Sequence, residues 1–371
     1  MKKPKVLISI NTAWNVFNFR SGLIKALINA GYDVVVAAPQ DKYVDRVKAL
    51  GVRFISLPID SGGTHPIKDS ILFIRYMVLF FREKPDFYLG YTIKPNIYGG
   101  GAANLLRIPV INNIAGLGSI FIKNTWLTFL VQKLYKFTLK GSKKVFFQNN
   151  EDRNLFIENK LVKTEKTDCL PGSGVNLRKF IPIKQPNNLR VRFLLVARIL
   201  WEKGIGEFVD AAKLLKKDGC QAEFCILGFM DSKNPSSINV EQMNRWVSEG
   251  YINYLGVTDD VVSEIEKADC VVLPSYYREG TPRSLLEAAA MGRPIITTDV
   301  IGCRNVVDDG VNGYICKPRD VLHLSEKMKK FLSLSIEERA DFGSRGRYKM
   351  EKQFDEKIVT TKYIEALREF V

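Results

Sequence analysis

The feature of this 371-residue sequence that most constrains its fold is an alternation of short β-rich runs with helical stretches, which occurs twice in succession. Such alternation is typical of parallel sheets covered by helices. In the first half we expect strands at 5–10, 33–37, 53–57, 87–90, 109–113 and 144–148, and helices at 19–30, 43–50, 67–82, 97–106 and 127–139. In the second half we expect strands at 192–197, 222–227, 252–255, 270–274, 295–298 and 313–316, and helices at 206–217, 261–267, 283–291 and 322–334. The sequence therefore predicts an α/β protein with two Rossmann-like domains that face a cleft.

The length supports the same division, because 371 residues exceed what one hydrophobic core usually serves. The segment 180–189 contains two prolines and two asparagines and is the best candidate for a linker. We therefore expect a first domain over residues 1–185 and a second over 186–354. A last helix, over 355–371, follows the second alternation and is expected to cross back to the first domain.

Positive charge is concentrated in the first half of the chain. Residues 1–185 hold 28 basic against 12 acidic residues, whereas the remainder holds 27 against 28, and the formal net charge is +15. No acidic residue lies between Asp86 and Glu151. One-sided charge of this kind implies a polyanionic partner, such as nucleic acid, an anionic membrane or a phosphorylated substrate.

The acid-free stretch also has the pattern of a membrane-surface helix. Over residues 119–140, aromatic and aliphatic residues interleave with lysines at near-helical spacing, and the helix expected over 71–82 is equally apolar and basic. This is the composition of a helix that rests on anionic lipid. The alternative is that the apolar face is core and the lysines are a solvated face. No apolar run approaches the ~20 residues of a spanning helix, so we expect peripheral contact with the membrane.

Several kinds of site are disfavoured by composition. Only two histidines occur, the six cysteines include no Cys-x-x-Cys, and Asp-x-Asp is absent. We therefore expect neither a metal site nor a bound cofactor, and a reduced, cytoplasmic protein. A dehydrogenase is disfavoured because no Gly-x-Gly-x-x-Gly follows the first strand.

The most informative motif is SYYREGTPRSLLE, residues 275–287. A strand ends just before it, and a helix is expected to begin near Pro282 with Thr281 as its N-cap. Open α/β sheets bind ligands at the carboxyl ends of their strands, and the N–H groups at a helix N-terminus suit a diphosphate. Glu279 precedes this helix, and Glu287 lies about two turns inside it. The alternative is that both are ordinary carboxylates of a surface helix and loop.

This motif resembles the Glu-x7-Glu motif of the GT4 family of retaining nucleotide-sugar glycosyltransferases, which have the GT-B fold. A second stretch, LVARILWEKG at 195–204, resembles the family's diphosphate-binding turn and places Arg198 and Lys203 on it. Two cations there would neutralise the charge that develops on the departing nucleotide. The resemblance implies that Arg198, Lys203 and Glu279 are catalytic, with Glu279 orienting the sugar hydroxyls. It also implies donor-binding roles for Gly118, Gly228, Arg283, Ser284, Leu285 and Glu287.

Residues 91–99 and 112–121 resemble one bacterial subgroup of this family, which extends glycans carried on a polyprenyl diphosphate. Residues 17–20, FNFR, and 228–235 are similar to the same subgroup. The resemblance implies transfer of an N-acetylhexosamine from a UDP-sugar to such an acceptor, on the inner face of the cytoplasmic membrane, in surface-glycan or glycoprotein-glycan assembly. The acceptor-binding residues that it implies are Asn15, Phe19, Arg20, Lys94 and Asn96.

Two other classes stay open at this point. One is another GT-B nucleotide-sugar enzyme, such as an epimerase, although the shortage of histidines argues against general acid–base catalysis near the sugar. The other is a basic nucleic-acid-binding protein. That reading lacks a compact nucleic-acid module or a stacked aromatic signature, so we expect no nucleic-acid partner.

Overall fold

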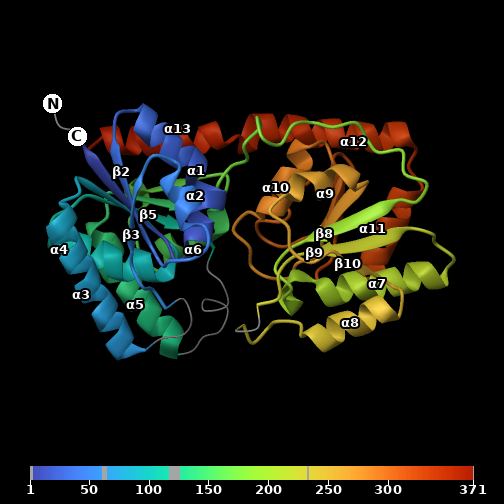
Figure 1. Ribbon diagram of the computed structural model, residues 1–371, viewed down its shortest axis with the longest axis horizontal. Coiled ribbons are helices and arrows are strands. Elements are labelled where there is room, and N and C mark those ends of the chain that lie inside the picture. Colours follow the sequence, from blue (N-terminus) through green and yellow to red (C-terminus); the bar gives the residue numbers. More distant parts are fainter. Residues whose placement is uncertain (1–2, 61–64, 117–125, 232–233, 371) are drawn as a thin grey trace. The chain divides into compact units, whose positions relative to one another are not determined.

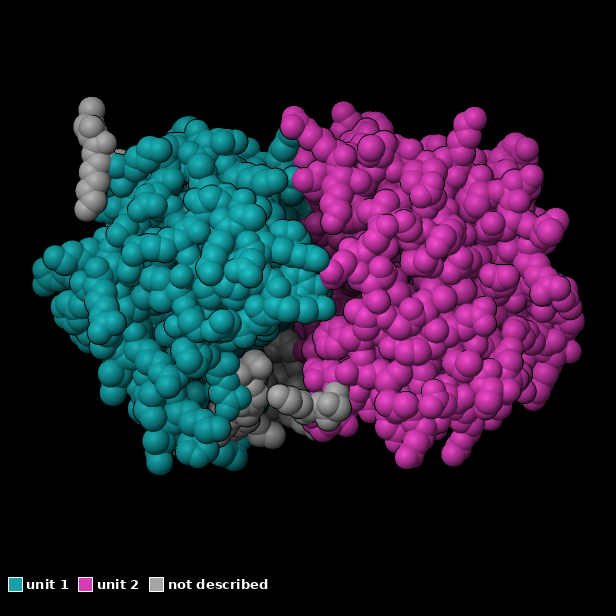
Figure 2. Space-filling view, in the orientation of Figure 1, with its two compact units in different colours: residues 1–174, 356–371 teal, residues 175–355 magenta. Residues whose placement is uncertain are grey.

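The computed structural model describes residues 3–60, 65–116, 126–231 and 234–370. The chain forms two compact units, one made of residues 1–174 with 356–371 and the other of residues 175–355 (Figures 1 and 2). Each unit contains one parallel sheet with helices on both faces. The expected α/β fold with two Rossmann-like domains is confirmed.

The sheet of unit 1 has seven strands in the order β3-β2-β1-β4-β5-β6-β7, and every neighbouring pair is parallel. Six of these strands were expected, and the short edge strand β7 was not. Their bounds are β1 (Lys5–Ser9), β2 (Asp33–Ala38), β3 (Arg53–Ser56), β4 (Phe87–Tyr91), β5 (Val110–Ile114), β6 (Lys144–Phe147) and β7 (Thr167–Cys169).

Helices cover both faces of this sheet, and their bounds are α1 (Ala13–Asn29), α2 (Val44–Lys48), α3 (Pro66–Glu83), α4 (Gly100–Leu105), α5 (Trp126–Gly141), α6 (Asn150–Glu158) and α13 (Glu356–Arg368), with single turns η1 (Pro95–Gly99) and η3 (Thr164–Lys166). Helix α1 begins six residues before the expected start. The Thr12 side chain caps it by accepting a hydrogen bond from the Asn15 N–H at 3.0 Å. Helices α1, α2 and α13 pack on one face, and α3, α4 and α5 lie along the other (Figure 1).

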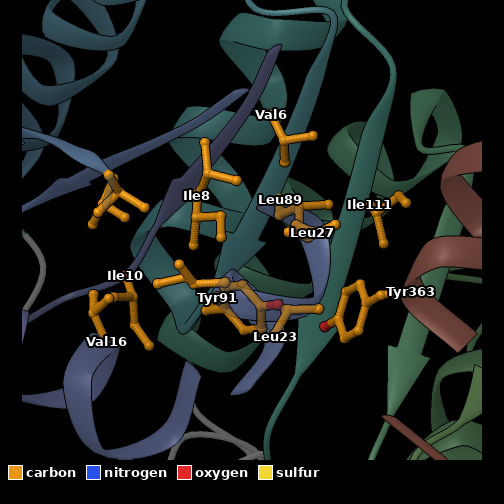
Figure 3. Close-up of a cluster of buried hydrophobic side chains, with 14 of the residues drawn as sticks. Val6, Ile8, Ile10, Val16, Leu23, Leu27, Leu89, Tyr91, Ile111 and Tyr363 are labelled. Atoms are coloured by element: carbon orange, nitrogen blue, oxygen red, sulfur yellow. The ribbon is translucent and has the colours of Figure 1, made fainter. Parts of the chain in front are cut away.

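The core of unit 1 follows from the two-residue period of its strands. Val6 and Ile8 of β1 face the cluster that α1 covers, whereas Leu7 between them faces the cluster beneath α3. Figure 3 shows the first cluster, in which Tyr363 of α13 joins the side chains of the strands. The Tyr363 ring centroid lies 4.9 Å from that of Phe146. The last helix therefore packs within unit 1.

The sheet of unit 2 has six parallel strands in the order β10-β9-β8-β11-β12-β13. The strands are β8 (Arg192–Val196), β9 (Glu223–Leu227), β10 (Asn253–Tyr254), β11 (Cys270–Leu273), β12 (Ile295–Thr298) and β13 (Gly313–Cys316). The helices are α7 (Ile205–Lys217), α8 (Val240–Ser248), α9 (Val261–Lys267), α10 (Arg283–Ala290), α11 (Val321–Leu332) and α12 (Ile336–Lys349), with single turns η4 (Trp201–Lys203) and η5 (Met350–Phe354).

The boundary between the units differs from the expected one at residue 185. The chain enters unit 2 at Val175, so residues 175–185 belong to the second unit. Phe180 is fully buried in its core, and the Arg347 guanidinium donates a hydrogen bond to the Phe180 carbonyl at 2.7 Å. The boundary was predicted too late in the sequence. The prolines and asparagines of residues 180–189 suggested a linker, but this extended segment packs on unit 2.

Candidate active site

The two motif-bearing loops meet at the point where the strand order of unit 2 reverses. Strands β8 and β11 are neighbours at the centre of the sheet. The sheet continues from β8 through β9 and β10 on one side, and from β11 through β12 and β13 on the other. The loop after β8 carries Arg198 and Lys203, and the loop after β11 carries Glu279. In open α/β sheets, the crevice at the carboxyl ends of two such strands is where ligands bind.

Backbone contacts join these two loops. The carbonyl of Glu202 accepts hydrogen bonds from the N–H groups of Tyr276 and Tyr277 at 3.1 and 3.2 Å. Gly204 follows with φ of +77°, and a Cβ on it would lie 2.1 Å from the carbonyl oxygen of Pro274. Only glycine therefore allows the first loop to approach the end of β11 so closely.

The predicted catalytic residues gather here. The ammonium of Lys203 forms an ion pair with Glu279, and each side chain is only 12% exposed. Lys203 Nζ also lies 5.1 Å from the centroid of the Tyr277 ring. Burial raises the pKa of the Tyr277 phenol, and the positive charge of Arg198 partly opposes that rise. Arg198 itself is exposed, so its guanidinium is available to an anionic ligand.

Gly228 has a structural reason to be glycine beside this site. It follows β9, and a Cβ there would lie 1.7 Å from the carbonyl oxygen of Ala197, the residue before Arg198. Its N–H donates to the Gly256 carbonyl at 2.9 Å. The backbone of residue 228 therefore fixes the point from which Arg198 extends, and direct contact with the donor stays a prediction.

Helix α10 begins at Arg283, and its N-cap is Pro282, so the expected cap at Thr281 is wrong. Pro282 itself makes no side-chain capping hydrogen bond. Its first N–H groups, at Arg283, Ser284 and Leu285, precede the first helical hydrogen bond, which Leu286 N–H donates to the Pro282 carbonyl at 3.3 Å. They add a partial positive charge beside the two cations. The Leu285 side chain is fully buried, so Leu285 could contribute only its amide.

Glu287 lies on the next turn of α10, with its side chain largely buried. Arg283 Nε donates to its Oε1 at 2.9 Å. Burial raises the pKa of Glu287 above its usual value, and the charge of Arg283 offsets part of that rise. The ion pair with Arg283 thus fixes the carboxylate on the helix that begins at the predicted diphosphate site.

Residues outside the 275–287 motif pack against the backbone of the turn between β11 and α10. A Cβ on Gly302 would lie 1.8 Å from the Gly280 carbonyl oxygen, and the Thr298 hydroxyl donates to the carbonyl of Ser275. The thiol of Cys303 is fully buried, and burial raises its pKa to about 12, so it is no nucleophile. In the sequence, the only sign of this support was the segment TTDVIG, residues 297–302, which begins at the end of the strand β12 that follows α10.

In unit 1, Asn15, Phe19 and Arg20 lie on α1, just after β1. Asn15 is partly exposed on the first turn. Phe19 packs edge to face against Trp14, with ring centroids 5.1 Å apart. Arg20 is only 5% exposed, and its guanidinium stacks 4.3 Å from the centroid of Tyr91. The structure therefore places Arg20 inside the unit, and an acceptor contact for it stays a prediction.

The second group of predicted acceptor residues follows β4, the strand beside β1. Thr92 there has φ of +62°, a strained conformation for a β-branched residue and one that is found most often at functional sites. Lys94 Nζ forms an ion pair with Asp69 of α3 at 2.8 Å. Asn96 is buried, and its amide donates to the Asn113 carbonyl at 2.8 Å, which joins the turn η1 to strand β5. The remaining predicted residue, Gly118, lies outside the described residues.

Lys94 also lines a pocket of about 530 Å³ within unit 1. Lys68 and Arg75 of α3 line it as well, together with Asp60 and Asp69. Lys68 pairs with Asp60 at 3.1 Å, but Arg75 donates to the Pro58 carbonyl at 3.0 Å and has no acidic partner among the described residues. The pocket therefore carries one uncompensated positive charge.

Helices α3, α4 and α5 lie side by side next to this pocket (Figure 1). Their exposed side chains are mostly apolar and basic, and we call them the α3–α5 surface. Trp126 is 75% exposed, and Phe137 is 77% exposed. The other exposed apolar residues of this surface are Ile67, Ile71, Ile74, Val78 and Phe81 of α3, Leu105 of α4, and Phe129 and Leu130 of α5. Its exposed bases are Lys68, Arg75, Arg82, Lys133, Lys136 and Lys140, and no exposed residue in the described parts of α3 and α5 is acidic.

Two features are absent from the described residues, namely a membrane-spanning helix and a cluster of metal ligands. None of the helices described is long and apolar enough to cross a membrane. Within the same ranges, no group of three or more His, Cys, Asp or Glu side chains could hold a metal ion.

Comparison with known proteins bears on both halves of the chain. The family described as glycosyl transferases group 1 matches residues 178–349, and the family described as glycosyl transferase 4-like matches residues 5–149. The first match covers all six strands of the sheet in unit 2, and the second covers six of the seven strands of the sheet in unit 1. A solved glycosyltransferase from Rickettsia africae superimposes with a TM-score of 0.81 over 100% of this chain and 99% of its own, at 18% identity, and so shares the fold.

Two relatives have similar sequences. The N,N'-diacetylbacillosaminyl-diphospho-undecaprenol alpha-1,3-N-acetylgalactosaminyltransferase of Campylobacter jejuni is 30% identical over 367 residues, 94% of each chain. The UDP-Gal:alpha-D-GlcNAc-diphosphoundecaprenol alpha-1,3-galactosyltransferase of Escherichia coli is 26% identical over 77% of this chain and 75% of its own. Since the first similarity spans nearly all of both proteins and the family matches fall on both units, this chain belongs to the GT4-like, group 1 family of glycosyltransferases, has the GT-B fold and is a nucleotide-sugar-dependent hexosyltransferase.

Proposed function

We propose that this enzyme transfers an N-acetylhexosamine from a UDP-sugar, with retention at the anomeric carbon, to a saccharide carried on a polyprenyl diphosphate. The observation that carries the donor side is the ion pair between Lys203 and Glu279, which joins the loop that also carries Arg198 to the turn that leads into α10. Both relatives named above act on diphospho-undecaprenol-linked saccharides, and the name of one specifies a UDP-sugar. The reaction would take place on the inner face of the cytoplasmic membrane, in surface-glycan or glycoprotein-glycan assembly.

On the donor side, Arg198, Lys203 and the first amides of α10 would bind the diphosphate. They would stabilise the negative charge that develops on it as the glycosidic bond breaks. Glu279 would accept hydrogen bonds from the sugar hydroxyls, and Glu287 from those of the ribose. The departing phosphate oxygen would take the proton of the acceptor hydroxyl as the new bond forms. Because the cations already neutralise the diphosphate, we propose that no metal ion is needed.

On the acceptor side, we place the diphosphate of the lipid-linked saccharide in the pocket beside Lys94. Arg75 supplies a cation without an acidic partner among the described residues, and Lys68 and Lys94 add two more. Ile71 lines the pocket and also belongs to the α3–α5 surface. A ligand with a charged head and an apolar tail could therefore lie partly in the pocket and partly along this surface.

The α3–α5 surface favours a membrane over nucleic acid as the polyanionic partner. Nucleic acid is bound by bases that contact phosphates and by aromatic rings that stack on nucleobases. Here most of the exposed side chains between the lysines and arginines are aliphatic, such as Ile67, Ile74 and Val78. Bulky apolar residues next to lysines suit the boundary between acyl chains and anionic headgroups.

The proposal is tested by offering the purified enzyme a panel of nucleotide sugars with short polyprenyl-diphosphate-linked acceptors. We expect transfer from a UDP-linked N-acetylhexosamine, with an α-linkage in the NMR spectrum of the product, and equal activity in excess EDTA. An inverted linkage would contradict retention. Loss of activity in EDTA that manganese or magnesium restores would contradict the metal-independent mechanism. Transfer only to acceptors that lack the lipid diphosphate would overturn the proposed acceptor class.

A pH-dependent donor affinity is expected from Glu287. Its pKa is raised by burial, so it takes up a proton at a higher pH than an ordinary carboxyl group and then loses its strength as an acceptor. The KM for the donor should therefore rise as the pH falls from neutral towards about 5. Glu287→Gln should raise this KM about tenfold at neutral pH, the scale of one hydrogen bond to a charged group, and should flatten its pH dependence.

The matched control for that variant is Glu264→Gln. Glu264 is also largely buried in unit 2 and ion-paired, to Arg192 at 2.8 Å, but it lies on α9 away from the motif loops. Its replacement should leave the pH dependence of the donor KM unchanged. An unchanged pH profile in Glu287→Gln would remove Glu287 from the donor site.

A further inference from the structure

Ser275 lies at the junction of the two donor loops and is fully buried. Its hydroxyl oxygen lies 3.0 Å from Oε1 of Glu279 and 3.1 Å from the carbonyl oxygen of Glu202, and it accepts a hydrogen bond from the Tyr277 N–H at 3.2 Å. One side chain thus contacts the loop after β8, the turn after β11 and the carboxylate that the motif places next to the donor.

The contact with Glu279 is specific to one of its oxygens. Oε1 receives both the Lys203 ammonium and the Ser275 hydroxyl, whereas Oε2 has no hydrogen-bond partner among the described residues. A serine hydroxyl has a single proton, and a carboxylate is a stronger acceptor than a carbonyl. The proton of Ser275 therefore goes to Oε1, which fixes the rotation of the carboxylate and leaves Oε2 without a hydrogen-bond partner among the described residues.

We propose that Ser275 is a positioning residue for sugar transfer, because it fixes the Glu279 carboxylate so that Oε2 meets the hydroxyls of the donor sugar. The inference rests on the proposed contact between Glu279 and that sugar. It has a specific consequence: Ser275 acts on recognition of the sugar and not on recognition of the nucleotide.

The test compares Ser275→Ala, Glu279→Ala and the double variant. Ser275→Ala should lower kcat with the UDP-sugar about tenfold, while the Kd for UDP alone, measured by calorimetry, stays within about twofold of the wild-type value. In the Glu279→Ala background, Ser275→Ala should have no further effect, because the group that it positions is gone. Ser275→Cys, which keeps the shape but donates weakly, should have intermediate activity and covers the case in which the alanine variant folds poorly.

The matched control is Ser325→Ala. Ser325 is also buried in unit 2, and its hydroxyl donates to the Leu322 carbonyl at 2.8 Å on α11. This variant should keep full activity. Additive losses in the double variant, or weaker binding of UDP itself in Ser275→Ala, would overturn the positioning role. Normal activity of Ser275→Ala with an impaired Glu279→Ala would overturn it alone, whereas a fully active Glu279→Ala would overturn the proposed donor site as well.

Discussion

Replacing Lys203 by alanine is expected to lower turnover by about 100-fold or more, the scale of losing one positioned electrostatic group in a transition state. The side chain is largely buried, stacks on Tyr277 and forms an ion pair with Glu279. Removing it deletes a cation from the diphosphate site and also leaves the Glu279 carboxylate next to the phosphates without its partner. Both changes oppose the negative charge that builds on the leaving group, so kcat should fall more than KM rises. Steady-state kinetics with the preferred donor measure both.

Lys327→Ala is the control that tests whether removing any buried, ion-paired lysine of unit 2 causes the same loss of turnover. Lys327 is also mostly buried in unit 2 and pairs with a carboxylate, Asp309, at 3.3 Å, but it lies on α11. It should keep near-normal turnover. Both variants should show cooperative thermal unfolding, which excludes misfolding. Near-normal activity in a folded Lys203→Ala would show that another group neutralises the diphosphate, and Arg198 would then be the first residue to replace.

The residues of the candidate donor site could be brought together from sequence because its parts are close in the chain. Glu279 and Glu287 lie in one strand–turn–helix unit, and Arg198 and Lys203 lie in one turn. What brings the two turns together is the adjacency of β8 and β11, which the parallel alternation implies. Ser275 was not predicted, because its role depends on a three-way contact across that junction and not on a spacing.

Which residues are accessible to an acceptor depends on burial, and the spacing of residues in the sequence does not show burial. Asn96 and Arg20 carry polar groups that a sequence reading assigns to a ligand, but the structure surrounds both with strands and helices of unit 1. Conversely, Asp69 and Arg75 lie on α3, and only the folded chain brings them beside Lys94. Contacts between elements that are far apart in the sequence produce no motif of fixed residue spacing, so they cannot be predicted from such a motif.

The fold itself followed from hydrophobic pattern wherever a segment was apolar. Strands buried on both faces, such as β2 and β12, were placed within one residue of their observed bounds. The helices that escaped prediction, α6, α8 and α12, have predominantly polar sequences and begin at side-chain caps, namely Asn149, Asn239 and Ser335. Their local capping signals are weaker than an apolar stripe, so they become visible only beside the sheet that they cover.

The structure distinguishes between the five lysines of residues 133–144 as candidates for contact with a membrane. Lys133, Lys136 and Lys140 are exposed on α5 beside Phe129 and Phe137. In contrast, Lys144 lies within β6, and Lys143 stacks 5.4 Å from the Phe370 ring at the C-terminal end of the chain. The α3–α5 surface therefore includes three of the five lysines in this part of the sequence.

Changing Lys133, Lys136 and Lys140 together to glutamine should weaken binding to anionic vesicles about 100-fold, since each lysine near such a surface contributes about 1 kcal/mol. Wild-type binding should weaken steeply as salt rises, and binding of the variant less so. Activity on a long-chain acceptor in vesicles should fall in parallel. A short-chain acceptor that keeps the diphosphate should be turned over normally, because the donor site and the pocket beside Lys94 are intact.

Two further variants make this expectation specific. Changing Lys217, Lys267 and Lys352 of unit 2, which are also exposed, removes the same charge elsewhere and should leave vesicle binding nearly unchanged. Arg75→Ala should instead raise the KM for both acceptors, because the diphosphate that it would bind is common to them. Equal losses on both acceptors in the α5 triple variant, or vesicle binding that is indifferent to salt, would mean that the α3–α5 surface meets a protein or solvent. Its exposed Trp126 and Phe137 would then need a different partner to cover them.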